Sequence, residues 1–256
     1  GPRLAIWRAP TDNDANLWGD EHLALRWREA GLDRLAEDLR EVEATQLGPQ
    51  CVRVAVRSRL SPPEGAVGFD CEYTYTVCGS GDLLIDAHVL PYGELPPLPR
   101  VGLRLELPGA FDALTWYGRG PQETYADRKL GARVGVYSGP VDEQYYPYIV
   151  PQETGNKVDV RWAALTRTDG VGLLAVGMPL LNVSALRYSP EDLTEARHTC
   201  ELQRREEVIL HLDQHHSGLG NASCGPGRLP QYHVQPVETH VRARLRPFSG
   251  CRRRWR

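Results

Sequence analysis

Lysine, methionine and long apolar runs are almost absent from this sequence of 256 residues. It has two lysines beside 28 arginines, a bias more typical of a GC-rich genome than of a particular chemistry. Its formal net charge of -3 is close to neutral. No strong electrostatic field therefore favours nucleic acid or an anionic membrane as a partner. No run of about 18 apolar residues occurs, and we expect no membrane-spanning segment.

Paired cysteines are also missing, because none of the six forms a CxxC motif, which argues against a zinc ribbon or a redox site. We expect free thiols in the reducing cytoplasm, with a disulfide between Cys71 and Cys78 as the alternative, since both fall in one predicted hairpin. The first residues lack the charged and apolar regions of a signal peptide. The chain opens Gly-Pro and its only methionine is Met178, and we therefore expect a polypeptide cut from a longer one.

Alternation of apolar and polar residues dominates what is present. It predicts strands with one buried face, separated by turn clusters rich in glycine and proline. Helical periodicity is nearly absent except at residues 20–35, where Leu23, Trp27 and Leu32 partly fit a short amphipathic helix. The predicted strands occupy residues 51–60, 69–78, 83–90, 100–108, 158–167, 171–178, 207–216 and 239–247.

This pattern predicts an all-β fold, a large antiparallel β-sandwich, because strands do not alternate with helices as they do in a parallel α/β sheet. We expect one domain over residues 4–248 and a basic, disordered tail at residues 249–256. In such a fold the long loops carry any function.

The stretch DQHHSGLGNASCGPG, residues 213–227, carries the first candidate chemistry. Asp213 and His215 alternate with His211, so the three could share one strand face and bind zinc or non-haem iron, although a solvated strand face has the same pattern. Cys224 could be a nucleophile with His216 as its base. The residues favour a plainer interpretation, in which Cys224 is a small packing residue in a tight glycine loop.

Three further segments combine aromatic, acidic and arginine side chains: RAPTDND at 8–14, WYGRGPQETYADRK at 116–129 and DEQYYPYIVPQETG at 142–155. Such side chains hold sugars by stacking and hydrogen bonding, but they also build ordinary loops and protein interfaces. Glu123 and Glu153 could form the carboxylate pair that acid and base work at a glycosidic bond requires. Only their place in these loops supports that pair, and a sequence with 33 acidic residues yields such pairs by chance.

In the order RAPTDND, WYGRGPQETYADRK, VDEQYYPYIVPQETGNKVDVRW and DQHHSGLGNASCGPG, the motifs resemble the C-terminal domain of glycoside hydrolase family 2 β-galactosidases, also called domain 5 or the small-chain domain. The match spans residues 6–247. The resemblance implies a supersandwich akin to galactose mutarotase. It also implies that the catalytic (β/α)₈ barrel and its glutamates lie outside this chain, and we expect no catalytic residue here and no galactoside hydrolysis by the chain alone.

The family's C-terminal domain lends a loop to the mouth of the active site, and this loop corresponds by resemblance to residues 218–225. In well-known members a tryptophan of the loop forms a sugar platform. Here the loop is slightly shorter, and Cys224 lies at or next to that position. The segment that follows residues 151–155 resembles a second element of the family that lies close to the active site. The substrate-binding residues that the resemblance implies are Gly218, Gly220, Asn221, Ser223, Cys224, Glu153 and Asn156.

The resemblance implies as partner the catalytic barrel of a parent β-galactosidase, or a large subunit if the enzyme is split, with a galactoside such as lactose as substrate. Parent enzymes use magnesium and sodium, whose ligands lie mainly in other domains, and we expect no metal or cofactor in this chain. The alternatives are a free-standing galactose-binding module, a scaffold that has interfaces but no sugar contact, and a mutarotase-like epimerase, which needs an acid and a base converging on the anomeric centre. No such pair is evident in the motifs.

Overall fold

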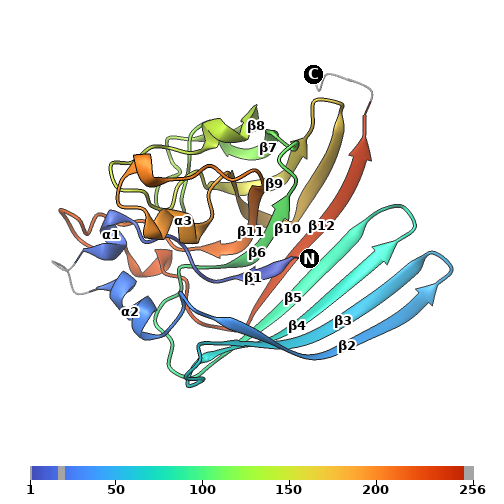
Figure 1. The fold of residues 1–256 in the computed structure, drawn as a ribbon, viewed down its shortest axis with the longest axis horizontal. Coiled ribbons are helices and arrows are strands. Elements are labelled where there is room, and N and C mark those ends of the chain that lie inside the picture. The colour runs from blue at the N-terminus through green and yellow to red at the C-terminus, as the bar shows by residue number, and fades with distance from the viewer. Residues whose placement is uncertain (1, 17–20, 251–256) are drawn as a thin grey trace.

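The computed structural model describes residues 2–16 and 21–250, whose strands pair antiparallel (Figure 1). The prediction of a large antiparallel all-β fold is confirmed. The strands are β1 (Arg3–Ala5), β2 (Ala36–Gly48), β3 (Cys51–Ser61), β4 (Gly68–Cys78), β5 (Leu83–Tyr92), β6 (Arg100–Leu107), β7 (Ala113–Gly120), β8 (Arg133–Pro140), β9 (Lys157–Thr166), β10 (Val171–Leu186), β11 (Val208–His216) and β12 (Thr239–Ser249). The helices are α1 (Asp12–Ala15), α2 (Leu23–Glu29), α3 (Pro190–Glu195) and the 3-10 turns η1 (Val141–Gln144), η2 (Thr199–Glu201) and η3 (Pro230–Tyr232).

One curled sheet contains the 12 strands of the described residues, in the order β1, β6, β11, β10, β12, β5, β4, β3, β2, with β9, β7 and β8 branching from β10. The branch exists because β10 is long: residues 171–177 pair with β12, residues 182–186 pair with β11, and β9 follows its other edge. Figure 1 shows β2 to β5 as one arm of the sheet, with the helices and long loops gathered at the left. The loops that carry the polar motifs therefore lie at one end of the sheet.

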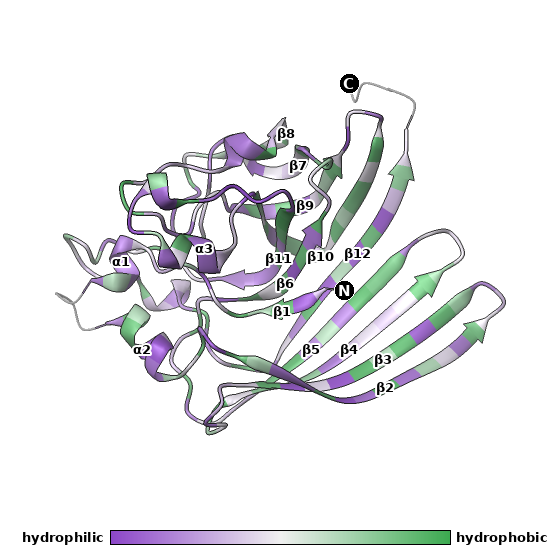
Figure 2. Ribbon diagram, in the orientation of Figure 1, coloured by the Kyte–Doolittle hydropathy of each residue, from purple (hydrophilic) through white to green (hydrophobic). Residues whose placement is uncertain are grey.

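The core forms where the inner faces of the curled sheet meet, because successive side chains of a strand point to opposite faces. On β5, Ile85 and Ala87 are buried, while Asp86 between them lies on the outer face. Figure 2 shows hydrophobic and hydrophilic residues alternating along β3 and β12. Trp27 of α2 and Trp116 of β7 are buried in the same core, and large aromatic side chains such as these contribute strongly to its stability.

The strands predicted from alternation are all present, and β10 continues to Leu186 beyond its predicted end. Strands β1, β2, β7 and β8 are not predicted. β2 forms an edge of the sheet, and its residues are exposed from Ala36 to Leu47. A strand with little burial on either face needs no apolar alternation, and its sequence therefore carries a weak signal.

Helix α2 confirms the amphipathic helix, but it is shorter than the predicted 20–35, and residue 20 lies outside the described residues. Leu23 and Trp27 face the core, where Trp27 Nε1 donates to the main-chain oxygen of Pro97 at 2.6 Å. The chain turns away at Gly31, which has a φ of +70° and would place a Cβ 2.5 Å from the Cβ of Pro62. Only glycine fits there, and the helix ends before it.

The alternative disulfide between Cys71 and Cys78 is wrong, because both residues lie on β4 and a strand rises about 3.3 Å per residue. Cys78 instead faces Cys51 of β3, with 3.8 Å between the two sulfur atoms. A disulfide bond is about 2.05 Å long. The prediction of free thiols is confirmed for the described cysteines, which are Cys51, Cys71, Cys78, Cys200 and Cys224.

The chain ends of the described part carry little further structure. β12 ends at Ser249, and from residue 251 onward the predicted basic tail at 249–256 lies outside the described residues. Within the described ranges, no helix has the length and apolar character needed to cross a membrane.

Candidate functional site

The four sequence motifs meet at one end of the sheet and form what we call the motif junction: residues 8–14, 123–128, 153–157 and 213–228. Main-chain hydrogen bonds join them directly, from Glu153 N to Ala9 O at 3.1 Å and from Thr124 N to Asn156 O at 2.7 Å. Segments far apart in the sequence are thus fixed against one another at the end where Figure 1 shows α1.

A buried ion cluster of Arg8, Asp14 and Arg228 holds the junction together. The Asp14 carboxylate accepts hydrogen bonds from Arg8 Nε and Nη2 at 3.1 and 2.8 Å and from Arg228 Nη2 at 2.5 Å. Burial opposes ionisation of Asp14, but the charges of Arg8 and Arg228 outweigh it and hold the pKa below its usual value. Arg8 also donates to the main-chain oxygen of Ser217 at 2.7 Å, and the cluster therefore anchors the loop that follows β11.

A second buried group joins Arg100 of β6 to Glu153, Asp213 and His216. Arg100 lies 2.5 Å from a Glu153 oxygen and 3.4 Å from an Asp213 oxygen, and His216 Nε2 lies 3.8 Å from Glu153 Oε1. Burial raises the pKa of Asp213 to about 7 and also raises the pKa of Glu153, in both cases against the charge of Arg100. Burial and the charge of Arg100 hold the pKa of His216 well below its usual range. Burial in this group therefore disfavours the charged forms of Asp213, Glu153 and His216 alike.

A β-bulge in β11 decides which histidine joins this group. Asp213 pairs with Gly102 of β6, and the register shifts between Asp213 and His215. The extra residue turns His216 into the interior and leaves His215 exposed. The alternation that would place His211, Asp213 and His215 on one face is broken at the bulge, and the structure does not bring these three together as metal ligands. Gly102 allows the close approach, because a Cβ there would lie 1.9 Å from Asp213 Oδ1.

Glu123 braces the segment that precedes β9. It accepts hydrogen bonds from the Tyr148 hydroxyl, from Thr154 Oγ1 at 3.1 Å and from Gly155 N at 2.7 Å. Glu153 lies in the same segment but points to the buried guanidinium of Arg100. Both candidate carboxylates are therefore engaged within this chain.

The loop of residues 217–228, which we call the glycine loop, is clasped from two sides. The Asp127 carboxylate accepts the main-chain N–H groups of Leu219 at 2.9 Å and Gly220 at 2.7 Å. Arg128 Nη2 and Asn13 Nδ2 donate to the Gly220 oxygen at 2.5 and 2.8 Å. Gly220 has a φ of +67° and would place a Cβ 2.8 Å from the main-chain nitrogen of residue 228, and this tight base therefore requires glycine.

The residues predicted to bind substrate all lie in the motif junction, but their exposure differs. Cys224 is exposed whereas His216 is buried against Glu153 and Asp213, an arrangement that does not support Cys224 and His216 as nucleophile and base. Asn156 donates to the main-chain oxygen of Thr124 at 2.8 Å. The exposed tip of the glycine loop contains Asn221, Ser223 and Cys224, and the buried residues are Gly218, Gly220, Glu153 and Asn156.

Sequence reasoning places Arg8 and Asp127 in candidate motifs without giving either a role, and it does not identify Arg100 or Arg228 as residues of the site. One local signal points to Asp14: the sequence TDND at 11–14 fits a capping box, and Thr11 and Asp14 form one at the start of α1. The other partners are remote: Arg100 and Glu153 are 53 positions apart, and Arg228 and Asp14 are 214 apart. No spacing pattern reveals such pairs.

A polar cleft of about 300 Å³ adjoins the glycine loop. Its lining includes Lys129, Asp159, His215 and Tyr232, and the Tyr232 main-chain oxygen accepts a hydrogen bond from Gly218 N at 2.9 Å. Lys129 Nζ lies 3.2 Å from Asp159 Oδ1 across this lining. The cleft is therefore lined by charged and polar residues, as a site for a polar ligand is.

Comparison with known proteins assigns the chain to a family. The family model described as "Beta galactosidase small chain" matches residues 1–245. The chain belongs to the beta-galactosidase small-chain family. This membership confirms the resemblance that the four motifs carry.

The beta-galactosidases to which the chain is similar are much longer than the chain. A beta-galactosidase of Priestia megaterium (strain DSM 319 / IMG 1521) is 37% identical over 220 residues, which are 86% of this chain and 20% of that protein. A beta-galactosidase of Arthrobacter sp. (strain B7) is 33% identical in an alignment 269 residues long, which covers 96% of this chain and 26% of that protein. The small-chain domain thus spans about a fifth to a quarter of these relatives. A solved GalM/aldose epimerase homologue from C. elegans is 12% identical, with 83% of this chain and 70% of that chain covered and a TM-score of 0.43.

Proposed function

We propose that this chain is the C-terminal domain of a cytoplasmic β-galactosidase that hydrolyses terminal β-galactosides such as lactose, and that it completes the rim of the active site. The supporting observation is the exposed tip of the glycine loop, which carries Asn221, Ser223 and Cys224 on a clasped base. A rim must present polar atoms from a rigid support, because small positional errors weaken substrate binding. The partner is the catalytic barrel of the parent chain or, in a split enzyme, a large subunit.

The chain is not catalytic alone in this proposal. Hydrolysis of a glycosidic bond uses two carboxyl groups that face the substrate. Glu123 accepts four hydrogen bonds, from the hydroxyls of Tyr125, Tyr148 and Thr154 and from Gly155 N, and the Glu153 side chain is 3% exposed beside Arg100. We expect no turnover of a chromogenic galactoside by the purified chain, and turnover that copurifies with it through several columns would contradict this part of the proposal.

A substitution at the tip tests the rim function in the complete enzyme. We expect Cys224→Trp to change the KM for a galactoside at least several-fold, because a large ring at the tip reshapes the mouth of the pocket. Cys200→Trp is the matched control, since Cys200 is also an exposed free thiol but lies outside the motif junction. Equal kinetic parameters for the two variants would refute the rim function.

The inner face of the arm β2 to β4 supports a contact with the rest of the enzyme. Val42, Val56 and Tyr73 form one row across these strands, with Tyr73 in the core and Val42 56% exposed. In a neighbouring row Val52 and Val77 are 39% and 49% exposed. The apolar face of the core thus continues uncovered to the edge strand, and such surfaces mark interaction sites. The occupant we propose is the part of a β-galactosidase that this chain does not cover.

Charge substitutions on β2 test this contact. We expect Val42→Asp to weaken binding of the chain to the remaining part of the enzyme at least tenfold, because a carboxylate would be buried against an apolar surface. Thr45→Asp is the control, since Thr45 is exposed on the opposite face of β2. Equal affinities of the two variants, measured by titration calorimetry, would show that this face is not the contact.

The polar cleft favours a second candidate, a free-standing galactose-binding module. The epimerase alternative would need His216 and Glu153 as its acid and base, but their side chains are 1% and 3% exposed, which does not support contact of both with a sugar. Titration of the chain with galactose and lactose, followed by NMR, separates the candidates. Saturable shifts at residues lining the cleft would favour the binding module, and silence up to tens of millimolar would favour the rim function.

A further inference from the structure

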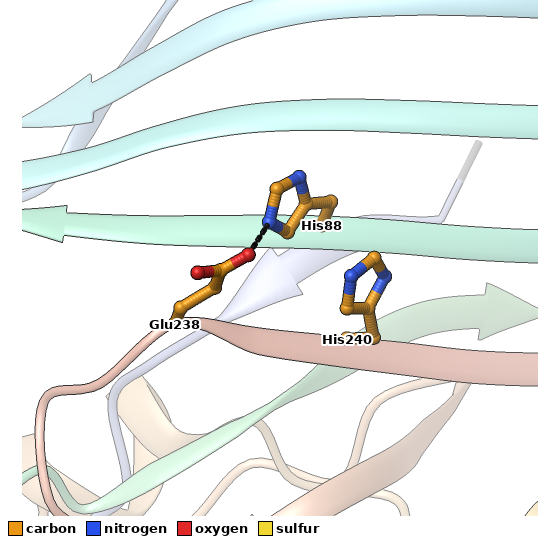
Figure 3. A group of neighbouring side chains, drawn as sticks. All are labelled: His88, Glu238 and His240. Atoms are coloured by element: carbon orange, nitrogen blue, oxygen red, sulfur yellow. Dashed lines mark hydrogen bonds and ion pairs between the residues drawn. The ribbon is translucent and has the colours of Figure 1, made fainter.

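Three metal-ligating side chains meet on the outer face of the sheet, away from the motif junction. Among the described residues, His88, Glu238 and His240 form the group whose ligand atoms lie within 4.8 Å of one another (Figure 3). His88 of β5 lies directly opposite His240 of β12, and Glu238 immediately precedes β12. We propose that these three side chains bind a divalent transition metal ion, zinc above all.

The donor set fits zinc. Two imidazoles and one carboxylate leave a fourth tetrahedral position for water, and nitrogen donors favour zinc over magnesium or calcium. Ligand atoms bound 2.1 Å from a tetrahedral ion lie about 3.4 Å apart. His88 Nε2 and Glu238 Oε1 are 2.7 Å apart. These two atoms therefore need to move apart by less than ~1 Å to admit the ion.

The side chains have the freedom to complete this geometry. The two imidazole rings are stacked, with 4.3 Å between centroids and 5° between planes, and both must tilt to direct their lone pairs at one ion. Glu238 is 63% exposed and His240 is 39% exposed. His88 is 23% exposed, and all three side chains lie on the outer face, so that they can move without disturbing the core on the other face of β5 and β12.

His240 also has a carboxylate behind it, which is how metal-ligating histidines are oriented. His240 Nδ1 lies 2.7 Å from Asp86 Oδ1. Since a carboxylate oxygen accepts, Nδ1 carries the proton and Nε2 keeps its lone pair for the ion. Figure 3 shows a ring nitrogen of His240 turned toward His88 and Glu238. His88 Nδ1 lies 3.9 Å from Glu72 Oε2, which is beyond hydrogen-bond distance but adds a negative charge close to the site.

Arginines fix these supporting carboxylates in place. Arg242 Nε donates to Asp86 Oδ2 at 2.8 Å, and Arg57 Nε donates to Glu72 Oε1 at 3.1 Å. With Glu238 included, three carboxylates face two guanidiniums, a balance that favours a bound cation. The ion would fasten the start of β12 to β5.

Sequence reasoning expects no metal in this chain, and the distance between the ligands explains why. His88 and Glu238 are 150 positions apart, and only Glu238 and His240 are close in sequence. The pairing of β5 with β12 brings the three together. The site is independent of the proposed β-galactosidase function, and either proposal can fail without the other.

Calorimetric titration of the metal-free 256-residue chain with zinc chloride tests the site. We expect one ion per chain, and at least tenfold weaker binding by His88→Ala and His240→Ala. Asp86→Asn keeps all three ligands and should weaken binding about 10- to 100-fold by releasing His240. His198→Ala is the control, because His198 is exposed and lies 2.9 Å from a Glu201 oxygen. No saturable binding, or equal losses in His198→Ala and His88→Ala, would mean only scattered surface binding and overturn the proposal.

A second measurement needs no variant. In the unsubstituted chain, zinc should shift the imidazole nitrogen resonances of His88 and His240 and leave those of His198 unchanged. At a hundredfold excess over the dissociation constant, the melting temperature should rise by about 5–10 °C. Equal shifts of all three histidines, or an unchanged melting temperature, would contradict a single built site.

Discussion

Replacing Asp14 by asparagine should destabilise the chain by about 3–5 kcal/mol, the range measured when one partner of a buried ion pair is removed. The carboxylate is completely buried and accepts hydrogen bonds from Arg8, from Arg228, and from the amide and hydroxyl of Thr11 at 2.9 and 3.0 Å. Asparagine keeps the shape but removes the charge that Arg8 and Arg228 share, and Arg228 keeps only Glu21, whose Oε2 lies 3.5 Å from Arg228 Nε. For a chain of this size, the loss corresponds to a fall in melting temperature of roughly 6–20 °C.

Urea unfolding followed by tryptophan fluorescence measures the loss, with Trp27 as a reporter because the Arg8 guanidinium lies 5.4 Å from its ring centroid. Asp70→Asn is the control: the pair of Asp70 and Arg59 is 46% and 44% exposed, and exposed pairs contribute about 0–1 kcal/mol. Because the folded pKa of Asp14 is lowered, its contribution is present above the unfolded pKa of about 3.9 and is lost as the pH falls through the folded pKa. Equal losses for Asp14→Asn and Asp70→Asn at pH 7 would refute the reasoning.

Further predictions concern the bulge and the glycine loop. Gly102→Ala should cost about 3 kcal/mol or more, because its Cβ would overlap Asp213, whereas Gly131→Ala meets no atom within 4 Å and should be nearly neutral in the same urea assay. Burial raises the folded pKa of Asp213 to about 7, so between pH 4 and 7 the folded state binds more protons. Stability relative to Asp213→Asn should therefore fall as the pH rises, by up to roughly 4 kcal/mol at about 1.4 kcal/mol per pH unit, and a flat difference would contradict the raised pKa. Asp127→Ala should speed hydrogen exchange of the Gly220 amide about 10- to 100-fold, since a charge-assisted hydrogen bond is lost, and unchanged exchange would show that the clasp does not hold the loop.

Local pattern predicted the strands whose two faces differ in burial. On β4, Phe69, Cys71 and Tyr73 are buried while Glu72 is exposed, and the alternation is therefore written in the sequence. β2 was not predicted, because a strand that is exposed along most of its length needs no alternation of apolar and polar residues. β7 and β8 are interrupted by glycines, with GRG in the first and a glycine every few residues in the second, which weakens any alternating signal.

Local sequence patterns also predicted part of the candidate site. The motif segments were recognisable because turn residues, aromatics and carboxylates cluster in them, and resemblance pointed to the glycine loop. The pairing of Arg100 with Glu153 and Asp213 was not predictable, because it depends on β6 lying beside β11 and on the bulge that turns His216 inward. Polar residues that pair across a long sequence separation produce no periodic pattern in the sequence.

The sequence by itself determined the all-β class, the places where chain reversals occur and the family, because these depend on local alternation, on turn chemistry and on motifs read in order. The tertiary structure alone decided which polar residues are buried together, which residues of the glycine loop reach solvent, and that His88, Glu238 and His240 meet across two strands. The physical reason is that a strand fixes only which face a side chain takes, whereas its neighbours depend on the pairing register and on bulges, which are properties of the whole sheet.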